Sequence, residues 1–110
     1  MKCNKKQGGL IRSVSNSLHI TVEGKAMMAA ALYAFHDADM IRVMNDLQRL
    51  QDQDWITIQS WENEYDGKEA FCSDSFYVEH GHVYRLKTSF YTYFQDVVEN
   101  KELISDLQYY

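Results

Sequence analysis

The sequence predicts a small α+β domain with the element order β-α-α-β-β-(β)-α. Segments of alternating apolar and polar residues give way to segments whose apolar residues recur three and four positions apart, which favours a mixture of strands and helices. Glycine-containing turn signals separate these segments, and a length of 110 residues fits one domain. The alternative is a set of helices packed on one face of a small antiparallel sheet. We expect residues 1–9 to form a flexible basic tail and residues 10–110 to form the single α+β domain.

The domain is predicted to begin with a short strand and an alanine-rich helix. Residues 17–23 alternate apolar and polar side chains, which is typical of a strand with one face on the core. Gly24 ends that strand, and residues 25–36 are rich in Ala and Met, which are strong helix formers. The strand residues expected in the core are Leu18, Ile20 and Val22.

A second helix is predicted from the aspartates that follow to about residue 53. Asp37 or Asp39 would cap this helix, because a carboxylate accepts the free N–H groups of a first helical turn. Its apolar stripe would consist of residues three and four positions apart, namely Met40, Val43, Met44, Leu47 and Leu50.

The remainder of the chain is predicted to be strands followed by a helix. Residues 55–61 alternate and are β-branched or aromatic, which favours a strand. The Asp-Gly pair at 66–67 is a hairpin signal that leads to a return strand over residues 69–79. A turn at 80–82 precedes a third strand at 83–87. A last helix would begin at Thr88 or Ser89, with an apolar stripe of Phe90, Tyr93, Phe94, Val97, Ile104 and Leu107.

Negative charge is concentrated in the middle of the chain. The net charge is −5, but residues 37–79 carry eleven acids against three bases, whereas residues 1–12 carry four bases and no acid. Such a field repels phosphate and attracts basic surfaces. The residues expected to form an acidic partner-binding surface are Asp46, Asp52, Asp54, Glu62, Glu64 and Asp66. A solvated face kept for solubility is the alternative.

These charges predict a non-enzymatic regulatory or inhibitory protein that binds the basic surface of a protein partner. An immunity protein for a nuclease toxin, or a phage-type inhibitor of a nucleic-acid enzyme, would present carboxylates in this way. Eleven of the fifteen aromatic residues lie between residues 55 and 94, so both faces of the predicted sheet carry large apolar groups. The last helix covers one face, or that face is an interface, as in a homodimer. The interface candidates are Trp55, Trp61 and Tyr65.

Residues 42–50, Arg-Val-Met-Asn-Asp-Leu-Gln-Arg-Leu, are followed by Trp-Ile-Thr-Ile at 55–58. This stretch resembles the recognition helix and first wing strand of winged helix-turn-helix regulators, and residues 66–67 would fall in the wing. The resemblance covers about residues 26–108 and implies a winged-helix-like fold. It offers DNA-binding transcriptional regulation as the alternative function, with nucleic acid touched by Arg42, Asn45 and Arg49. The acids on the would-be recognition helix and wing oppose phosphate contacts, so protein binding is favoured.

No combination of residues predicts a catalytic site, a metal site or a cofactor. His80 and His82 flank Gly81 in a predicted turn with one adjacent carboxylate, too few ligands for a metal. Cys72 is expected to be a buried, inert thiol. We therefore expect a protein that is not an enzyme. The alternative is a small metal- or ligand-dependent enzyme that uses His36 together with the two turn histidines.

The sequence also bears on where the protein works. No apolar run reaches the roughly 18 residues that a membrane span needs, so no membrane partner is expected. The polar pair Gly8-Gly9 follows the N-terminal lysines where a signal peptide would have an apolar core. Cys3 and Cys72 do not form a disulfide framework. Together these observations predict a cytoplasmic protein.

Overall fold

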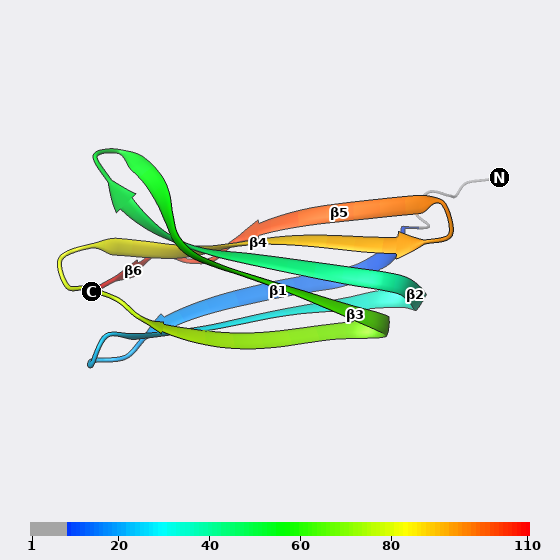
Figure 1. Cartoon of the computed structure of the whole chain (residues 1–110), viewed down its shortest axis with the longest axis horizontal. Helices are drawn as coiled ribbons and strands as arrows, with labels where there is room; N and C mark the ends of the chain where they lie inside the picture. The colour runs from blue at the N-terminus through cyan, green and yellow to red at the C-terminus, as the bar shows by residue number, and fades with distance from the viewer. Residues whose placement is uncertain (1–8) are drawn as a thin grey trace.

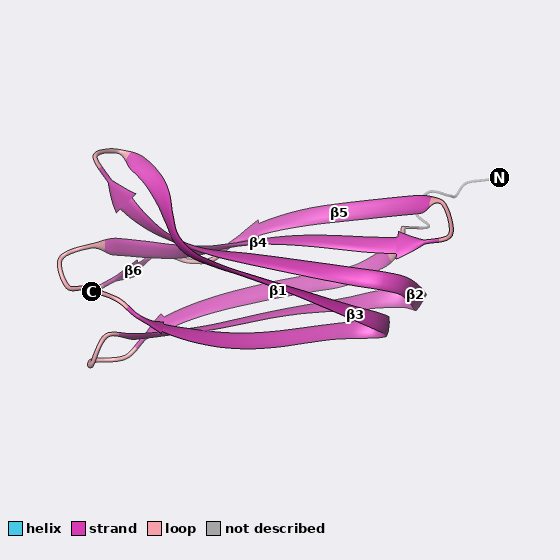
Figure 2. Ribbon diagram, in the orientation of Figure 1, coloured by secondary structure: helices cyan, strands magenta, loops and turns pink. Residues whose placement is uncertain are grey.

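The computed structural model describes residues 9–110, and every regular element among them is a β-strand (Figures 1 and 2). The strands are β1 (Ile11–Ile20), β2 (Lys25–Gln51), β3 (Asp54–Tyr77), β4 (Val83–Phe94), β5 (Val97–Ile104) and β6 (Gln108–Tyr109). Every strand pair runs antiparallel within one six-stranded sheet. The sheet curls into a half-barrel, as the ribbon shows.

Two long strands give the sheet its curl. The first part of β2, residues 25–34, pairs with β1 and with the end of β3, whereas its second part, residues 40–51, pairs with the start of β3 and with β4. We call these two parts of the sheet the β1 side and the β4 side. The β4 side also includes β5 and β6, which both pair with β4. Register shifts between Tyr33 and Ile41 mark the bend that separates the two sides.

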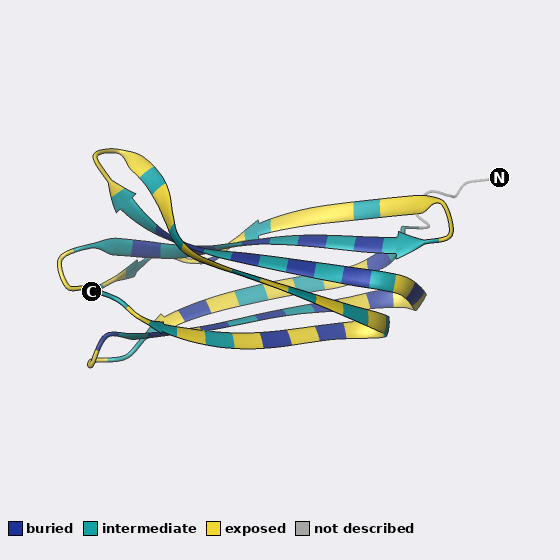
Figure 3. Cartoon of the chain, in the orientation of Figure 1, coloured by how far each residue is buried: buried dark blue, intermediate teal, exposed yellow. Residues whose placement is uncertain are grey.

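The core lies inside the curl, where the two sides face each other. Buried residues alternate with exposed or half-buried ones along much of β1, β2 and β4 (Figure 3). Both sides contribute to one cluster, in which Leu32 and Cys72 of the β1 side join Val43 and Phe90 of the β4 side. A second cluster at the other end of the curl consists of Leu18, Ala26, Met28, Leu47, Tyr84 and Leu86. The curl thus replaces the second layer that helices would otherwise supply.

The α+β prediction is wrong, because residues 25–36 and 37–53 do not form helices and the described chain contains only strands. The even-numbered residues from Ala26 to Ala34 are all buried, which is the period of a strand. The outward residues between them are also Ala, Met and Tyr, so the alternation is hidden in the sequence. Pairing on both edges of β2 overrides the helix propensity of alanine and methionine.

The resemblance to winged helix-turn-helix regulators fails for the same reason. Its recognition helix, residues 42–50, is the second part of β2. From Ile41 onward the buried residues are Ile41, Val43, Asn45 and Leu47, again with a period of two, and Gln48 is also buried at the register shift that follows. Because the polar Asn45 stands in this buried row, the helical spacing of Met40, Met44 and their neighbours looked more regular than the true alternation.

The last predicted helix is also wrong. Residues 88–94 continue β4, and the segment after them forms β5 and β6. Thr88 and Thr92 point into the core and are fully buried, so the inward row of β4 mixes threonine with Phe90. That mixture obscures the alternation, and the aromatic residues at helical spacing are divided between the two faces of the sheet.

Residues 66–67 do not form a hairpin turn. β3 continues through them, and Gly67 lies opposite Ala38 at the bend of the sheet. Gly67 has a φ of 94°, a conformation that favours glycine, so this residue lets β3 bend beside β2. The predicted strands over 55–61 and 69–79 are therefore two parts of one strand.

Several smaller predictions are confirmed. Residues 17–20 belong to β1, where Leu18 is buried, although Val22 lies in the following turn and is 92% exposed. Gly24 turns the chain with a φ of 90°, and a Cβ there would lie 2.7 Å from the Tyr110 hydroxyl. The turn at 80–82 separates β3 from β4 as expected.

Some expectations fall outside what the structure describes. The predicted basic tail, residues 1–9, and Cys3 lie outside the described residues, except for Gly9. Among residues 9–110 there is no helix long and apolar enough to cross a membrane.

Candidate functional site

The most distinctive feature of the sheet is that β3 is an edge strand along its whole length. Of the described strands, only β2 pairs with β3, and the pairing runs from Asp54 to Tyr77. On the β1 side the strand order is β3-β2-β1, and on the β4 side it is β3-β2-β4-β5. An edge strand presents unpaired backbone N–H and C=O groups to any chain that can pair with it.

The pairing pattern identifies which backbone groups of the first part of β3 face outward. The Ser105 N–H donates to the Leu86 carbonyl, so even-numbered residues of β4 bond toward β5 and odd-numbered ones toward β2. Carried through the registers of β4, β2 and β3, this alternation directs the odd-numbered residues between 59 and 65 of β3 toward β2. The backbone groups of Ser60, Glu62 and Glu64 therefore point away from the sheet.

The same strand carries a large excess of acids over bases. β3 contains six acids against the single base Lys68, a net charge of −5 that equals the net charge of the whole chain. The acids are Asp54, Glu62, Glu64, Asp66, Glu69 and Asp74. Four of the six predicted partner-binding acids therefore lie on one open edge. Asp46 lies beside it on β2, and Asp52 lies in the turn that leads into it.

Two of these glutamates share one arginine of β2. Arg42 Nε lies 3.3 Å from Glu62 Oε2, and Arg42 donates a hydrogen bond of 3.2 Å from Nη2 to Glu64 Oε2. That hydrogen bond is the main cause of a raised pKa of the Arg42 guanidinium. All three side chains are partly open to solvent, so these ion pairs add little stability. The two carboxylates thus keep the capacity to accept bonds from a partner.

The remaining predicted acids frame this pair. The Ser60 hydroxyl donates to Asp46 Oδ1 over 2.7 Å, which fixes that carboxylate beside the edge. Asp52 and Gln53 form the two-residue turn between β2 and β3, both with positive φ. This hairpin twists away from the rest of the sheet, as the green segment of Figure 1 shows. Its tip is therefore acidic and projects into solvent.

The predicted aromatic interface is divided between the two faces of the sheet. Trp61 packs on the second core cluster with its ring edge-to-face on Phe76, and Tyr65 packs on the first cluster. Trp55 instead lies under the Arg85 guanidinium, with 4.2 Å between Cζ and the ring centre. A bulge at Ile58 separates them, because Leu47 pairs with Gln59 but the next residue of β2 pairs with Thr57. One extra residue reverses the faces of a strand, a device that sequence alternation cannot reveal.

The second part of β3 protects its edge differently. The Tyr65 hydroxyl donates to the Phe71 carbonyl over 2.9 Å, and burial raises the pKa of this tyrosine. Asp74 lies opposite the buried Met28 and has one carboxylate oxygen that is buried without a partner. Burial raises the pKa of Asp74 as well. An inward-pointing charge and a capped carbonyl both discourage pairing at an edge.

The three residues predicted to touch DNA do not share a surface. Arg42 lies on the outer face with its two glutamates. Asn45 is only 2% exposed; its amide donates to Cys72 Sγ over 3.3 Å, and it accepts a hydrogen bond of 2.6 Å from the Thr88 hydroxyl. Asn16 of β1 in turn donates to Thr88 Oγ1 over 3.0 Å. These four residues form a polar chain through the core that ties the β1 side to the β4 side, and nothing in the sequence suggested it.

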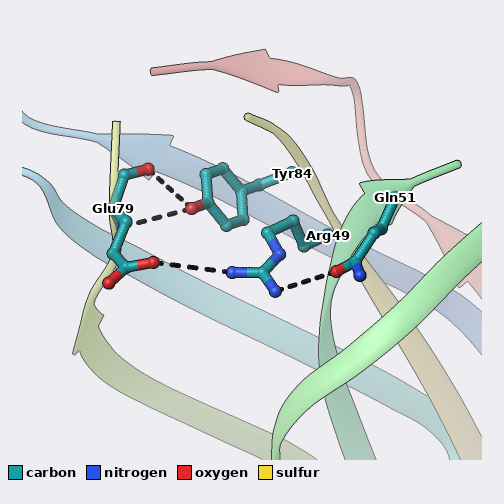
Figure 4. Close-up of polar contacts among 4 residues, drawn as sticks. All are labelled: Arg49, Gln51, Glu79 and Tyr84. Carbon is teal, nitrogen blue, oxygen red and sulfur yellow. Dashed lines mark hydrogen bonds and ion pairs between the residues drawn. The ribbon is translucent and has the colours of Figure 1, made fainter. Parts of the chain in front are cut away.

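Arg49 points inward at the open end of the curl (Figure 4). Its Nη1 lies 3.7 Å from Glu79 Oε1, and its Nη2 donates to Gln51 over 3.0 Å. Beside it, the Tyr84 hydroxyl donates to the Glu79 carbonyl over 2.7 Å. Burial is the main cause of the raised pKa of Tyr84. A cavity of about 240 Å³ lies here between Arg49, Glu79, Tyr84 and the apolar side chains of Ile58, Phe76 and Val78.

The structure does not bring the histidines together. His36 lies at the bend of β2, whereas His80 and His82 lie in the turn between β3 and β4 at the opposite end (Figure 1). His80 stacks on Tyr110 with ring centres 3.8 Å apart, and the ring of His82 lies edge-on to Tyr84. Residues 9–110 contain no group of three or more His, Cys, Asp or Glu side chains placed to hold a metal ion.

Cys72 is buried between the two sides, as the sequence predicts. Burial raises the pKa of its thiol, which disfavours the reactive thiolate. The hydrogen bond from the Asn45 amide acts in the opposite direction but is the smaller cause. The Cys72 side chain therefore packs as an apolar group that also accepts one bond.

Fold and site together define an all-β half-barrel with one long, open and acidic edge strand. Comparison of the chain with protein-family models, with curated proteins and with solved structures finds no match.

Proposed function

We propose that this protein is a non-enzymatic regulatory or inhibitory module that binds the basic surface of a protein partner through the acidic edge of β3. The observation that carries the proposal is the placement of Glu62 and Glu64 side by side on an unpaired edge, with Asp46 next to them. Their only described cation is the shared Arg42. Two carboxylates against one guanidinium leave a negative field at the edge that favours a basic partner.

The proposal has support from what surrounds the edge. The projecting hairpin adds two further carboxylates, Asp52 and Asp54, beyond the uncharged residues 55–61 of the same strand. Carboxylates on hydrogen-bonded strands, such as Asp46, Glu62 and Glu64, are better preorganised for binding than acids scattered over loops. A cytoplasmic setting belongs to the proposal, because the free thiol of Cys72 suits a reducing compartment.

The test is capture of a partner from cells of the native host with neutralised variants. The double variant Glu62→Gln/Glu64→Gln removes both edge charges with little change in shape. Glu102→Gln is the matched control, because Glu102 on β5 is similarly exposed and also pairs with one base, Lys87. We expect a basic protein that binds the wild type and the control, is lost from the double variant, and is released by salt.

Two outcomes would overturn the proposal. One is a partner that binds the double variant as tightly as the wild type. The other is a partner that is lost equally from the Glu102 control, because the effect would then come from overall charge and not from this edge.

A further inference from the structure

We propose that residues 60–64 of β3 bind their partner by strand addition, in which an extended basic segment pairs antiparallel with the open edge. This inference rests on the proposed function and adds the shape and sequence pattern of the segment that binds. The occupant is an extended stretch with basic residues at alternate positions and β-branched or other apolar residues between them.

The backbone of residues 60–64 has unpaired groups that an added strand could bond. Ser60, Glu62 and Glu64 direct their N–H and C=O groups away from β2, as the alternation of the sheet requires. No described strand approaches this side of β3. An added strand would satisfy these groups with main-chain hydrogen bonds, which give strand addition its affinity whatever the sequence of the partner.

The side chains of this segment define the sequence pattern of the strand that would be added. A residue directly opposite Glu62 or Glu64 on an added strand would share their outer face, within about 5.5 Å between Cβ atoms. Basic residues two positions apart would therefore each meet one glutamate. The residue between them would point to the inner face opposite Asn63, with the partly buried rings of Trp61 and Tyr65 on either side of it. This gives the pattern basic, apolar, basic.

The other part of the same edge does not offer such a site. The Phe71 carbonyl is already bonded by the Tyr65 hydroxyl, and Asp74 points inward without a partner. Phe71 itself is 64% exposed, but the outer face around it carries no array of charges. The site is therefore confined to the β4 side of the strand.

The binding experiment uses a defined peptide. The probe is an end-blocked Lys-Val-Lys-Val-Lys, and its control has the same composition with the three lysines adjacent. In the variant Trp55→Phe, Trp61 is the remaining tryptophan, so its fluorescence reports on the inner face. We expect the alternating peptide to bind more tightly than the control, to weaken about threefold to fivefold with each Glu→Gln change at 62 and 64, and to change the emission of Trp61.

A second arm removes backbone hydrogen bonds and leaves every charge in place. Ser60→Pro deletes one outward N–H, which an edge strand tolerates because that group does not bond to β2. It also removes the hydroxyl that bonds Asp46, so its binding is compared with that of Ser60→Ala, which lacks the same hydroxyl. Ser75→Pro is the matched control, because the backbone N–H of Ser75 also points away from the sheet. In the second part of β3 the Val78 N–H donates to the Gly24 carbonyl, so even-numbered residues bond toward β2 and odd-numbered ones point outward. We expect Ser60→Pro to lose peptide binding and Ser75→Pro to keep it. In the wild type, the amides of residues 60, 62 and 64 exchange fast when free and become protected by the peptide.

The outcomes separate this inference from the proposed function. Should Ser60→Pro unfold the chain, N-methylation of the peptide backbone makes the same test, because it removes N–H donors of the peptide and leaves the protein unchanged. Binding that survives both changes but disappears on neutralising the glutamates would overturn strand addition and leave the acidic surface intact. Binding that ignores the glutamates while the host partner is still lost from the double variant would also overturn the inference. Equal binding of the alternating peptide and its control would overturn the inference as well.

Discussion

Both parts of β3 form the edge of the sheet, and each part limits pairing with other strands in a different way. Residues 54–65 on the β4 side present free backbone groups, and they carry glutamates on the outer face next to them. Residues 69–77 on the β1 side carry an inward aspartate, and one of their outward carbonyls is capped by the Tyr65 hydroxyl. Both arrangements prevent indiscriminate pairing with other sheets. Only the first leaves an edge that a segment of the right charge can still use.

This difference teaches that charge and capping are not equivalent. A charged edge rejects apolar strands and admits a complementary one, whereas a capped edge rejects both. The contrast depends on the two sides being held in one curl, and the polar chain through the core is what joins them.

The largest effect is expected from breaking that polar chain. Asn45→Ala removes the donor to Cys72 and the acceptor of the Thr88 hydroxyl, so the buried Thr88 O–H is left without a partner while its oxygen still accepts from Asn16. We expect the free energy of unfolding to fall by about 2–4 kcal/mol. Urea denaturation measures this loss, and the contrast between the two parts of β3 should weaken as the sides separate.

The matched control for that variant is Thr92→Val. Thr92 is as deeply buried, but its hydroxyl has no partner in the structure. Its removal should leave stability unchanged or raise it by up to about 1 kcal/mol. An equal loss from both variants would show that the polar chain contributes no more than packing does.

A smaller effect of opposite sign is expected at Asp74. Burial raises the pKa of this carboxyl in the folded state, so the ionised form is disfavoured there. The destabilisation is absent below the usual aspartate pKa of about 3.9, where both states are protonated, and it is complete above the raised folded pKa. Asp74→Asn should therefore stabilise the protein by about 1 kcal/mol at pH 7, with the gain vanishing near pH 3. Denaturation at the two pH values measures it.

Exposed Asp54 at the hairpin tip provides the control for the charge itself, since Asp54→Asn should change stability little at either pH. A gain from Asp74→Asn that persists undiminished at pH 3 would contradict the assignment of its cause. Removing the inward charge should also make the second part of the edge more prone to self-association at neutral pH.

The smallest effect on stability is expected from uncapping the edge. Tyr65→Phe removes the hydroxyl that bonds the Phe71 carbonyl and keeps the ring in the core. Because this bond is exposed to solvent, we expect a loss of only about 0.5 kcal/mol together with concentration-dependent association, measured by light scattering. If the variant remains as monodisperse as the wild type, the hydroxyl does not protect this edge.

The extent to which the sequence predicts this structure depends on how each strand alternates. β1, with alternating residues 17–20, and the parts of β3 over 55–61 and 69–77 follow patterns that indicate strands. The sequence does not predict β2 as a strand, because Ala and Met fill both of its faces near Ala30 and because a buried Asn45 interrupts its inward row of apolar residues. These are cases in which pairing on both edges of a strand outweighs local propensity.

The candidate site was foreseen in composition but not in arrangement. Charge alone predicts Glu62 and Glu64 as binding residues, whereas their position on an open edge depends on β2 being a strand, which its sequence does not indicate. The bulge at Ile58 and the pairing of Arg42 with both glutamates depend on register, which is set by contacts across the sheet.

The two-residue turn at Asp52 and Gln53 has a consequence for the order of folding. Both residues have left-handed backbone angles, as type I′ hairpin turns require, so the longest ladder of the sheet can grow outward from this point without closing a long loop. The contacts that close the curl join far more distant segments, such as Asn16 and Thr88, and such contacts form late. The β2–β3 hairpin is therefore expected to exist before its core is covered. During that interval the net charge of −5 on β3 disfavours pairing between one such hairpin and another.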